Sequence, residues 1–439
     1  MRTLDYPELG ETLVQDELPN GLAVRILPKP GFRQTYACFT TRYGSIDREF
    51  VDPARREKVR MPDGVAHFLE HKLFEKEDGD VFRLFSQYGA QPNAATSFDM
   101  TTYLFSCTSH VEENLRTLLD FVQRPYFSDA SVEKEKGIIA QELLMYEDSP
   151  SHRVMYGLLQ AFFGDSPLSV NIGGTVGSIQ SITKEDLHAC YRTFYHPGNM
   201  MLFVAGPVNP AHAVALVRAH QDGGSGAPQA PVERTPPDVP ARPPRALEEA
   251  RLAVSQPRVL FGYKQSAVPD APSGRQAFEE AAGVWMDGLL GRGSDLFHRL
   301  VDEGLADMGF GTDFELTPHC GYSMIGGHSD HPLELAERVR RELRSAAAAG
   351  IDEAAFRRTK RKAIGRFFGL LDSPQSVASL YTSHWVRGLD LFATLPILER
   401  LTLDEVNASL RAHVQDDQFA VSVVWPHEDA RADGGADDD

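Results

Sequence analysis

One five-residue segment, His67-Phe68-Leu69-Glu70-His71, constrains what this chain can fold into more than any other. Histidines four positions apart lie on one face of an α-helix, about one turn from each other, so both imidazoles can reach a single ion. Glu70 falls within roughly 100° of both histidines around the helix axis. We predict a helix from about Gly64 to Glu75, capped by Asp63. The helix is expected to be buried because its other positions are mostly apolar: Ala66, Phe68, Leu69 and Leu73.

Buried imidazoles and carboxylates need a partner that offsets the loss of their hydration. A pair of core histidines bonded to carbonyl groups is one interpretation, and a divalent metal ion is the other. The order HxxEH inverts the commoner HExxH and is itself a zinc-peptidase signature. A hydrolytic zinc site needs three protein ligands and an open position for water. We therefore predict one Zn²⁺ held by His67, His71 and a third residue, with Glu70 as the general base beside the open position.

The third ligand is expected on a helix predicted over residues 129–147. Glu135 and Glu142 are seven residues apart, so they share a helical face, which also carries Ile138 and Ile139. Carboxylates on the apolar side of a helix are uncommon unless they have a partner. The remaining polar positions are expected to face solvent: Glu133, Lys134, Lys136 and Gln141. Spacing alone does not choose between Glu135 and Glu142.

The chain has 439 residues, enough for two domains of roughly 200 residues each. Strands, then long helices, then a return strand occur twice, on either side of a Pro/Gly-rich linker at 221–246. We predict an α+β fold of two related domains, residues 1–220 and 247–427, each a mostly antiparallel sheet packed with helices. Residues 428–439 are rich in Ala, Gly and Asp, which predicts a disordered acidic tail.

The net charge disfavours two classes of partner, and the cysteine spacing disfavours a disulfide framework or a cysteine metal site. The formal charge is −18, with 62 acidic and 44 basic residues, which disfavours nucleic acid and anionic membranes. No stretch approaches the roughly 20 apolar residues of a membrane helix, and we expect no signal peptide. The four cysteines show no CxxC spacing. We therefore expect a cytoplasmic protein that binds neither nucleic acid nor membrane.

Three segments, HFLEHKLFE, GAQPNAATSFDMTTYLFS and EKGIIAQELLMYEDSP, resemble in this order the insulinase/pitrilysin family of zinc peptidases. Weaker similarity extends over most of the chain. The resemblance implies a zinc endopeptidase that cleaves peptides or unfolded polypeptides inside a closed chamber. It also implies Glu142 as the third metal ligand and Glu135 as a supporting carboxylate of the catalytic site. Asn93 and Ala94 would lie on an edge strand that binds the substrate backbone by strand addition.

Members of this family form a clamshell of four related domains, in one long chain or two shorter subunits. This chain resembles one half, similar to the zinc-bearing subunit of bacterial two-subunit members. The opposite half normally carries an Arg and a Tyr near the zinc, but in LFHRLVDEGLAD their places are taken by Val301 and Asp307. The resemblance implies a heterodimer with a homologous subunit that supplies Arg and Tyr, or else a weakly active homodimer. The alternative function is a non-catalytic scaffold, although scaffold members typically have broken zinc motifs.

Overall fold

The computed structural model describes residues 1–77, 79–221 and 229–427. By their internal contacts the described residues divide into two compact units. Unit 1 contains Met1–Leu143, Asn171–Pro236 and Phe368–Phe392. Unit 2 contains Leu144–Val170, Pro237–Phe367 and the described residues from Ala393 on. Each unit combines a sheet with helices, so the predicted α+β fold with two domains is confirmed.

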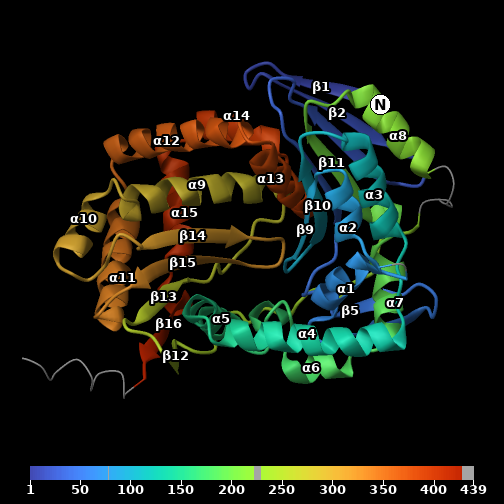
Figure 1. Cartoon of the computed structure of the whole chain (residues 1–439). Helices are drawn as coiled ribbons and strands as arrows, with labels where there is room; N and C mark the ends of the chain where they lie inside the picture. The colour runs from blue at the N-terminus through green and yellow to red at the C-terminus, as the bar shows by residue number, and fades with distance from the viewer. Residues whose placement is uncertain (78, 222–228, 428–439) are drawn as a thin grey trace, which may run out of the picture. The chain divides into compact units, whose positions relative to one another are not determined.

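Unit 1 is built on a seven-stranded sheet in the order β1-β2-β3-β11-β4-β10-β9 (Figure 1). β3 and β11 run parallel, and the other neighbouring strands of this sheet run antiparallel. β9 has one neighbour, β10, so it forms an edge of the sheet. The strands are β1 Arg2–Tyr6, β2 Glu11–Glu17, β3 Ala23–Pro28, β4 Thr35–Thr41, β9 Gln91–Thr96, β10 Thr101–Cys107 and β11 Met200–Gly206. Two short hairpins accompany them: β5 Glu49–Asp52 with β6 Glu57–Arg60, and β7 Glu75–Lys76 with β8 Gly79–Asp80.

Unit 2 is built on a five-stranded sheet in the order β12-β16-β13-β15-β14. β12 and β16 run parallel, and the remaining pairs run antiparallel. This order and these directions repeat those of β3, β11, β4, β10 and β9 in unit 1. The two units are therefore related in topology. The strands are β12 Leu247–Leu252, β13 Arg258–Tyr263, β14 Gly311–Leu316, β15 Gly321–His328 and β16 Phe419–Pro426.

Two helices pack in a different unit from the helices that precede and follow them in the sequence. α5 (Pro150–Phe163) packs on β12, β13 and β16 of unit 2, and α13 (Pro374–Arg387) packs on β4 and β11 of unit 1. The other helices of the first half are α1 Val65–Phe74, α2 Phe82–Gln87, α3 Val111–Gln123, α4 Asp129–Glu147, α6 Val176–Ser181, α7 Lys184–Phe194 and α8 Pro210–Gln221. Those of the second half are α9 Pro272–Leu290, α10 Asp295–Asp302, α11 Pro332–Ala349, α12 Glu353–Leu371, α14 Thr394–Arg400 and α15 Leu403–His413.

Each unit has its own apolar core. Helices α3 and α11 follow the amphipathic pattern, with their buried apolar residues on one face toward the sheet of their unit. Strands β4 and β11, in the middle of the unit 1 sheet, are buried along their whole length. The unit 1 core includes Phe39, Phe68, Tyr103 and Leu202, and the unit 2 core includes Phe261, Trp285, Leu300 and Val423.

The predicted linker has a described and an undescribed part. Residues 222–228 lie outside the described residues, as does the predicted tail at 428–439. The segment that follows residue 228 runs along β5, where the backbone N–H of Val51 donates to the carbonyl of Glu233 at 2.9 Å. Arg234 pairs with the buried carboxylate of Asp47 at 3.2 Å. This part of the segment is therefore held against unit 1.

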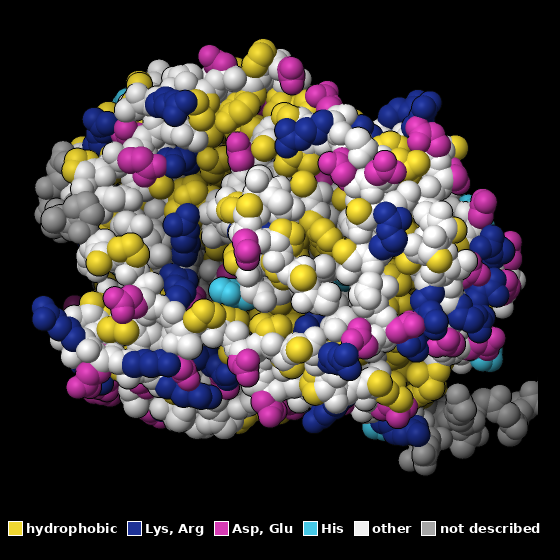
Figure 2. Space-filling model, turned by 180° about the vertical axis from the view of Figure 1, so that it is seen from behind, with side chains coloured by type: hydrophobic (Ala, Val, Ile, Leu, Met, Phe, Trp, Pro, Cys, Tyr) yellow, Lys and Arg dark blue, Asp and Glu magenta, His cyan; other side chains and the backbone are white. Residues whose placement is uncertain are grey.

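Charges of both signs are mixed on the face of the molecule that Figure 2 shows, where Lys and Arg are interspersed with Asp and Glu. None of the described helices is both long and apolar enough to cross a membrane. The four cysteines, Cys38, Cys107, Cys190 and Cys320, are buried and are not joined by disulfides.

Candidate metal centre

The start of α1 differs from the sequence prediction. Gly64, not Asp63, is the N-cap residue, and its φ of 89° is in the left-handed region that favours glycine. A Cβ at this position would lie 2.3 Å from the carbonyl oxygen of Gly173. The Asp63 carboxylate instead accepts a hydrogen bond from Nη1 of Arg48 at 2.8 Å. The predicted Asp63 cap is wrong because Arg48 holds this carboxylate and the close approach of the chain near Gly173 needs glycine.

The structure brings together His67 and His71 of α1 and Glu142 of α4. One ligand atom from each of the three lies within 4.8 Å of the others, and this is the one such His/Cys/Asp/Glu group among the residues described. Nε2 of His67 is 3.9 Å from Oε1 of Glu142, and Nε2 of His71 is 3.5 Å from Oε2. Both imidazoles therefore present the same ring nitrogen to one carboxylate.

These distances fit a zinc ion. Ligand bonds of about 2.0–2.2 Å would place neighbouring donor atoms of a tetrahedral site roughly 3.3–3.6 Å apart. The separations between each Nε2 and the Glu142 carboxylate, 3.5 and 3.9 Å, are close to that value and are long for direct hydrogen bonds. Two imidazoles and one carboxylate are also the donor set of many catalytic zinc sites. The residues present therefore suit the metal that the sequence predicts.

Glu135 has a different position from Glu142, although the two share a helical face. Its Oε1 is 3.0 Å from Nδ1 of His71, which donates to it. This bond keeps the proton of His71 on Nδ1, so Nε2 has a free lone pair toward Glu142. Burial opposes ionisation of Glu135, but the hydrogen bond from His71 and the positive charges of His71, Lys72 and Lys134 together outweigh it and lower the pKa of Glu135. Spacing left the two glutamates undistinguished, whereas the structure puts Glu142 with the two Nε2 atoms and Glu135 behind His71.

Glu70 lies beside this group, in the middle of α1, and is buried. Burial raises the pKa of Glu70, and a hydrogen bond from the hydroxyl of Thr96 partly offsets this effect. The Oγ1 of Thr96, the last residue of β9, donates to Oε2 of Glu70 at 2.6 Å. Burial also lowers the pKa of His67 to about 3, so its imidazole is neutral over the ordinary pH range. The sequence prediction did not single out Thr96, because its contact with Glu70 is tertiary.

Helix α4 departs from its predicted orientation at two residues. Ile139 is buried as predicted, but the side chain of Ile138 is 46% exposed. Lys136 was expected to face solvent, yet it is buried and its ammonium pairs with Glu133 at 2.6 Å. The prediction for Ile138 and Lys136 is wrong because α4 packs mainly through Val132, Ile139 and Leu143. A buried stripe this narrow leaves Ile138 outside it.

Asn93 and Ala94 lie in β9, with Ala94 opposite Tyr103 and Asn93 opposite Leu104 of β10. Asn93 is exposed, and its Oδ1 accepts a hydrogen bond from the backbone N–H of Ala94 at 2.9 Å. Since this N–H bonds to a side chain, it faces the free edge of the sheet. The same strand ends at Thr96, which contacts Glu70. An exposed sheet edge therefore leads directly to the candidate base.

Val301 and Asp307, which stand where the family resemblance places Arg and Tyr, offer no equivalent groups. Val301 lies on α10 and packs against the core of unit 2. Asp307 is exposed in the loop after α10, where its Oδ1 accepts a hydrogen bond from the N–H of Gly309 at 2.8 Å. Neither side chain can replace the cation or the phenol of the family pattern.

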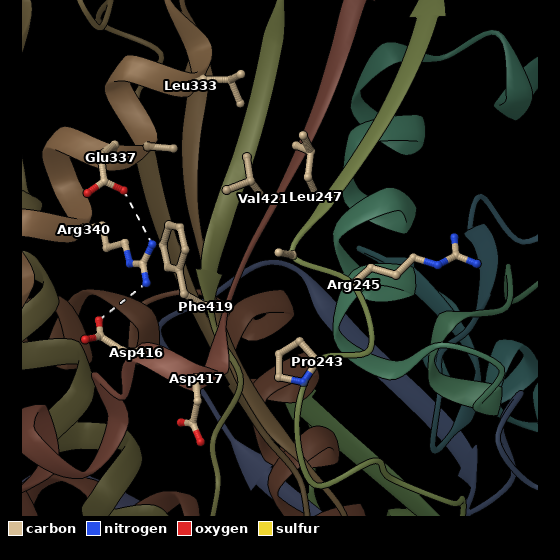
Figure 3. A pocket seen from close by; sticks show the side chains of 12 residues that line it. Pro243, Arg245, Leu247, Leu333, Glu337, Arg340, Asp416, Asp417, Phe419 and Val421 are labelled. Atoms are coloured by element: carbon tan, nitrogen blue, oxygen red, sulfur yellow. Dashed lines mark ion pairs between the residues drawn. The ribbon is translucent and has the colours of Figure 1, made fainter.

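Apart from the metal group, a hollow of about 400 Å³ lies in unit 2 between α11, β12 and β16 (Figure 3). The guanidinium of Arg340 lies over the ring of Phe419 and pairs at 3.6 Å with both Glu337 and Asp416. Since these charged groups satisfy one another, the hollow offers no equivalent of the His–Glu group. We assign it no role in the proposed reaction.

Comparison with known proteins places the chain in a family. Residues 55–176 match the model described as "Insulinase (Peptidase family M16)", and residues 181–363 match "Peptidase M16 inactive domain". A Bacillus subtilis (strain 168) protein described as "Uncharacterized zinc protease YmfH" is 40% identical over 97% of this chain and 99% of its own length. The Arabidopsis thaliana "Probable mitochondrial-processing peptidase subunit beta" is 24% identical over 94% of this chain and 78% of its own length.

Solved structures agree with the sequence comparison. A crystal structure of an M16-like peptidase from Alicyclobacillus acidocaldarius superposes with a TM-score of 0.91 at 38% identity, covering 97% of this chain and all of that one. The periplasmic protease PqqL from Escherichia coli shares the fold, with a TM-score of 0.73 at 17% identity, over 97% of this chain and 48% of its own. This chain therefore corresponds to about half the length of PqqL. Together, the matched models, the relative of 40% identity and the predicted resemblance show that this chain belongs to the insulinase family, peptidase family M16.

Proposed function

We propose that this chain is a zinc-dependent endopeptidase that hydrolyses peptides or unfolded polypeptides. The observation that carries the proposal is the convergence of His67, His71 and Glu142, with Glu70 beside them. Relatives described as zinc proteases support the same reaction class. The four residues come from two helices, one ending at Phe74 and the other beginning at Asp129, so their meeting is a property of the fold.

The chemistry divides among the residues of the site. Zn²⁺ would be held by Nε2 of His67, Nε2 of His71 and the Glu142 carboxylate, and when bound it supplies Lewis acidity toward water and the peptide carbonyl. Glu70 is the general base: it takes a proton from the attacking water and gives it to the leaving amine. Its raised pKa suits both steps. The carboxylate is a stronger base toward the attacking water, and the protonated acid can still donate its proton to the leaving amine. Glu135 fixes the ring of His71 through Nδ1.

The substrate is proposed to bind as an added strand on β9. An edge strand offers unpaired backbone groups to an extended peptide, which gives affinity without demanding a particular sequence. The outward N–H of Ala94 and the exposed side chain of Asn93 supply contacts two to three residues from Thr96. A peptide bound here would pass beside Glu70.

A homologous partner subunit is proposed to complete the site. Val301 and Asp307 do not supply a cation and a phenol, so these groups would come from a second chain, in a heterodimer or with less activity in a homodimer. Relatives that are named as subunits, and the two-fold length of PqqL, support pairing of such halves. Four buried cysteines that form no disulfides support our further proposal that the protein works in the cytoplasm, a reducing compartment.

The decisive experiment compares the wild-type chain with Glu70→Gln for zinc content and for cleavage of a fluorogenic peptide library. We expect one zinc per chain in both and cleavage in the wild type alone, because the amide cannot act as a base. Measurements are repeated with the homologous subunit encoded in the same genome, which we expect to raise the wild-type rate. Comparable cleavage by Glu70→Gln would refute the role of Glu70, and a wild-type chain that binds no metal would favour the scaffold function.

A further inference from the structure

Helix α1 carries a fully buried lysine beside the second histidine. Lys72 has 0% of its surface exposed, although it lies on the helix that holds the candidate metal ligands. A buried ammonium costs several kcal/mol unless it is paired and hydrogen-bonded. Lysine is among the residue types that are almost never fully buried without a partner. The position of Lys72 therefore requires an explanation beyond packing.

The contacts of Lys72 join α1 to α4 behind the metal group. Its ammonium pairs with the carboxylate of Glu75 and lies 3.4 Å from the carbonyl oxygen of Ser131 on α4. In an α-helix, this carbonyl accepts the backbone N–H of the residue four positions later, which is Glu135. The ammonium thus contacts the turn of α4 that places Glu135, and Glu135 in turn holds Nδ1 of His71.

We propose that Lys72 is a positioning residue of the metal centre, which acts through Glu135. It fixes α4 against α1 at Ser131 and supplies a buried positive charge close to a cluster of carboxylates. Glu135 is thereby held in place to orient the imidazole of His71. This inference rests on the proposed function, because it takes His67, His71 and Glu142 to be zinc ligands.

The sign of the effect separates this role from simple electrostatics. A cation near a zinc ion repels it, so Coulomb's law alone predicts tighter zinc binding once Lys72 loses its charge. A residue that orients a ligand has the opposite effect, since loss of such outer contacts typically weakens metal binding about 10- to 100-fold. We expect Lys72→Met to weaken zinc binding by about tenfold or more.

The test titrates metal-free protein with Zn²⁺ in competition with a fluorescent chelator. The matched control is Lys134→Met, which removes a charge next to Glu135 on the exposed side of α4. We expect the control to bind zinc within about twofold of wild type. We also expect the visible spectrum of the Co²⁺-loaded protein to change in Lys72→Met but not in the control, because the spectrum reports the geometry of the ligands.

A double-mutant cycle tests the route through Glu135. If Lys72 acts through Glu135, then Lys72→Met should have little further effect on zinc affinity in a Glu135→Gln background. If Lys72 only neutralises Glu75, the double variant of Lys72→Met with Glu75→Gln would restore wild-type affinity and overturn the proposal. Should Lys72→Met fail to fold, Lys72→Gln removes the same charge and is expected to weaken zinc binding as much.

Failure of this inference is distinguishable from failure of the proposed function. A wild-type chain that binds no zinc would refute the metal site itself. A wild-type chain that binds zinc, with Lys72→Met binding it equally or more tightly, would refute the positioning role alone. Additive effects of Lys72→Met and Glu135→Gln would show that Lys72 does not act through Glu135.

Discussion

The hydroxyl of Thr96 contacts the carboxylate of the candidate base, Glu70, and helps to orient it. Glu70 is nearly buried and carries a raised pKa, so the direction of its carboxylate depends on few contacts. Thr96 donates to one carboxylate oxygen at 2.6 Å and leaves the other for the reaction. Hydrogen bonds to a charged group contribute about 1.5–3 kcal/mol.

We predict that Thr96→Val lowers kcat by roughly 10- to 100-fold, the range that about 1.5–3 kcal/mol corresponds to. KM and zinc content should change little, because Thr96 is not a proposed ligand and the substitution leaves the backbone of β9 unchanged. Steady-state kinetics and metal analysis check this result. Thr96→Ser keeps the hydroxyl and is the control, so equal activity of the Val and Ser variants would contradict the prediction.

At the scale of residues, what the sequence could predict was local. His67, Glu70 and His71 are related by helix geometry, so their spacing alone places them on one face. Glu142 needed the family resemblance, because periodicity serves Glu135 equally well. Thr96 and Lys72 contact the site only once a strand and a second helix have packed against α1. Lys72 is the one polar residue of α1 to which the metal hypothesis gives no role, and this is the signal that could have identified it.

At the scale of elements, β9 links the edge of the unit 1 sheet to the candidate base, Glu70. It is an edge strand, exposed at alternate residues, and it ends at the residue that contacts Glu70. The predicted helix at 129–147 is confirmed as Asp129–Glu147. The prediction of its buried face was partly wrong, because the side chain of Ile138 is exposed. Which face of a helix is buried depends on the elements that pack against it.

We predict that Ala94→Pro raises KM for peptide substrates at least several-fold while zinc content stays the same. Proline removes the outward N–H that a substrate strand would use, and edge strands tolerate proline because this N–H bonds to no neighbouring strand. Kinetics with a peptide substrate and a thermal melt check the result. Unchanged KM in a folded variant would show that substrates do not bind as a strand at Ala94.

At the scale of the whole molecule, the predicted repeat is present as a repeat of strand order. The sequence suggested it through the order of strands and helices, although the identity between the halves is weak. The packing of α5 in unit 2 and α13 in unit 1 could not be predicted, because a helix pattern indicates an apolar face and not the sheet that covers it. Each unit also contains an imidazole whose pKa is lowered by burial: the half-buried His384 in unit 1 and the fully buried His413 in unit 2.

We predict that the metal-free protein becomes less stable as the pH falls below 6.5. Burial lowers the pKa of His413 to about 3 and that of His384 to about 4, so the unfolded chain binds protons that the folded chain excludes. Their contribution to stability is complete above the unfolded pKa of about 6.5 and decreases by about 1.4 kcal/mol per pH unit for each histidine below it. Urea unfolding followed by tryptophan fluorescence at pH 7.5 and 5.5 measures the change.

The variant His413→Gln is the control for this pH effect. Trp285, whose ring lies 5.9 Å from that of His413, reports on unit 2. We expect the midpoint of its transition to fall less between the two pH values in the variant than in wild type. An equal fall in both proteins would mean that other groups cause the acid sensitivity.

The packing of α5 and α13 has a consequence for how the chain can be divided. A cut between residues 221 and 229 would leave a first fragment that carries α5, a helix of unit 2, and lacks α13, a helix of unit 1. The second fragment would have the reverse defect. Neither piece could bury its own sheet, so each alone would expose apolar surface and aggregate. If the gene were split here, each polypeptide would need the other to fold. Separation of the two units into independent proteins by evolution at this point of the chain is therefore disfavoured.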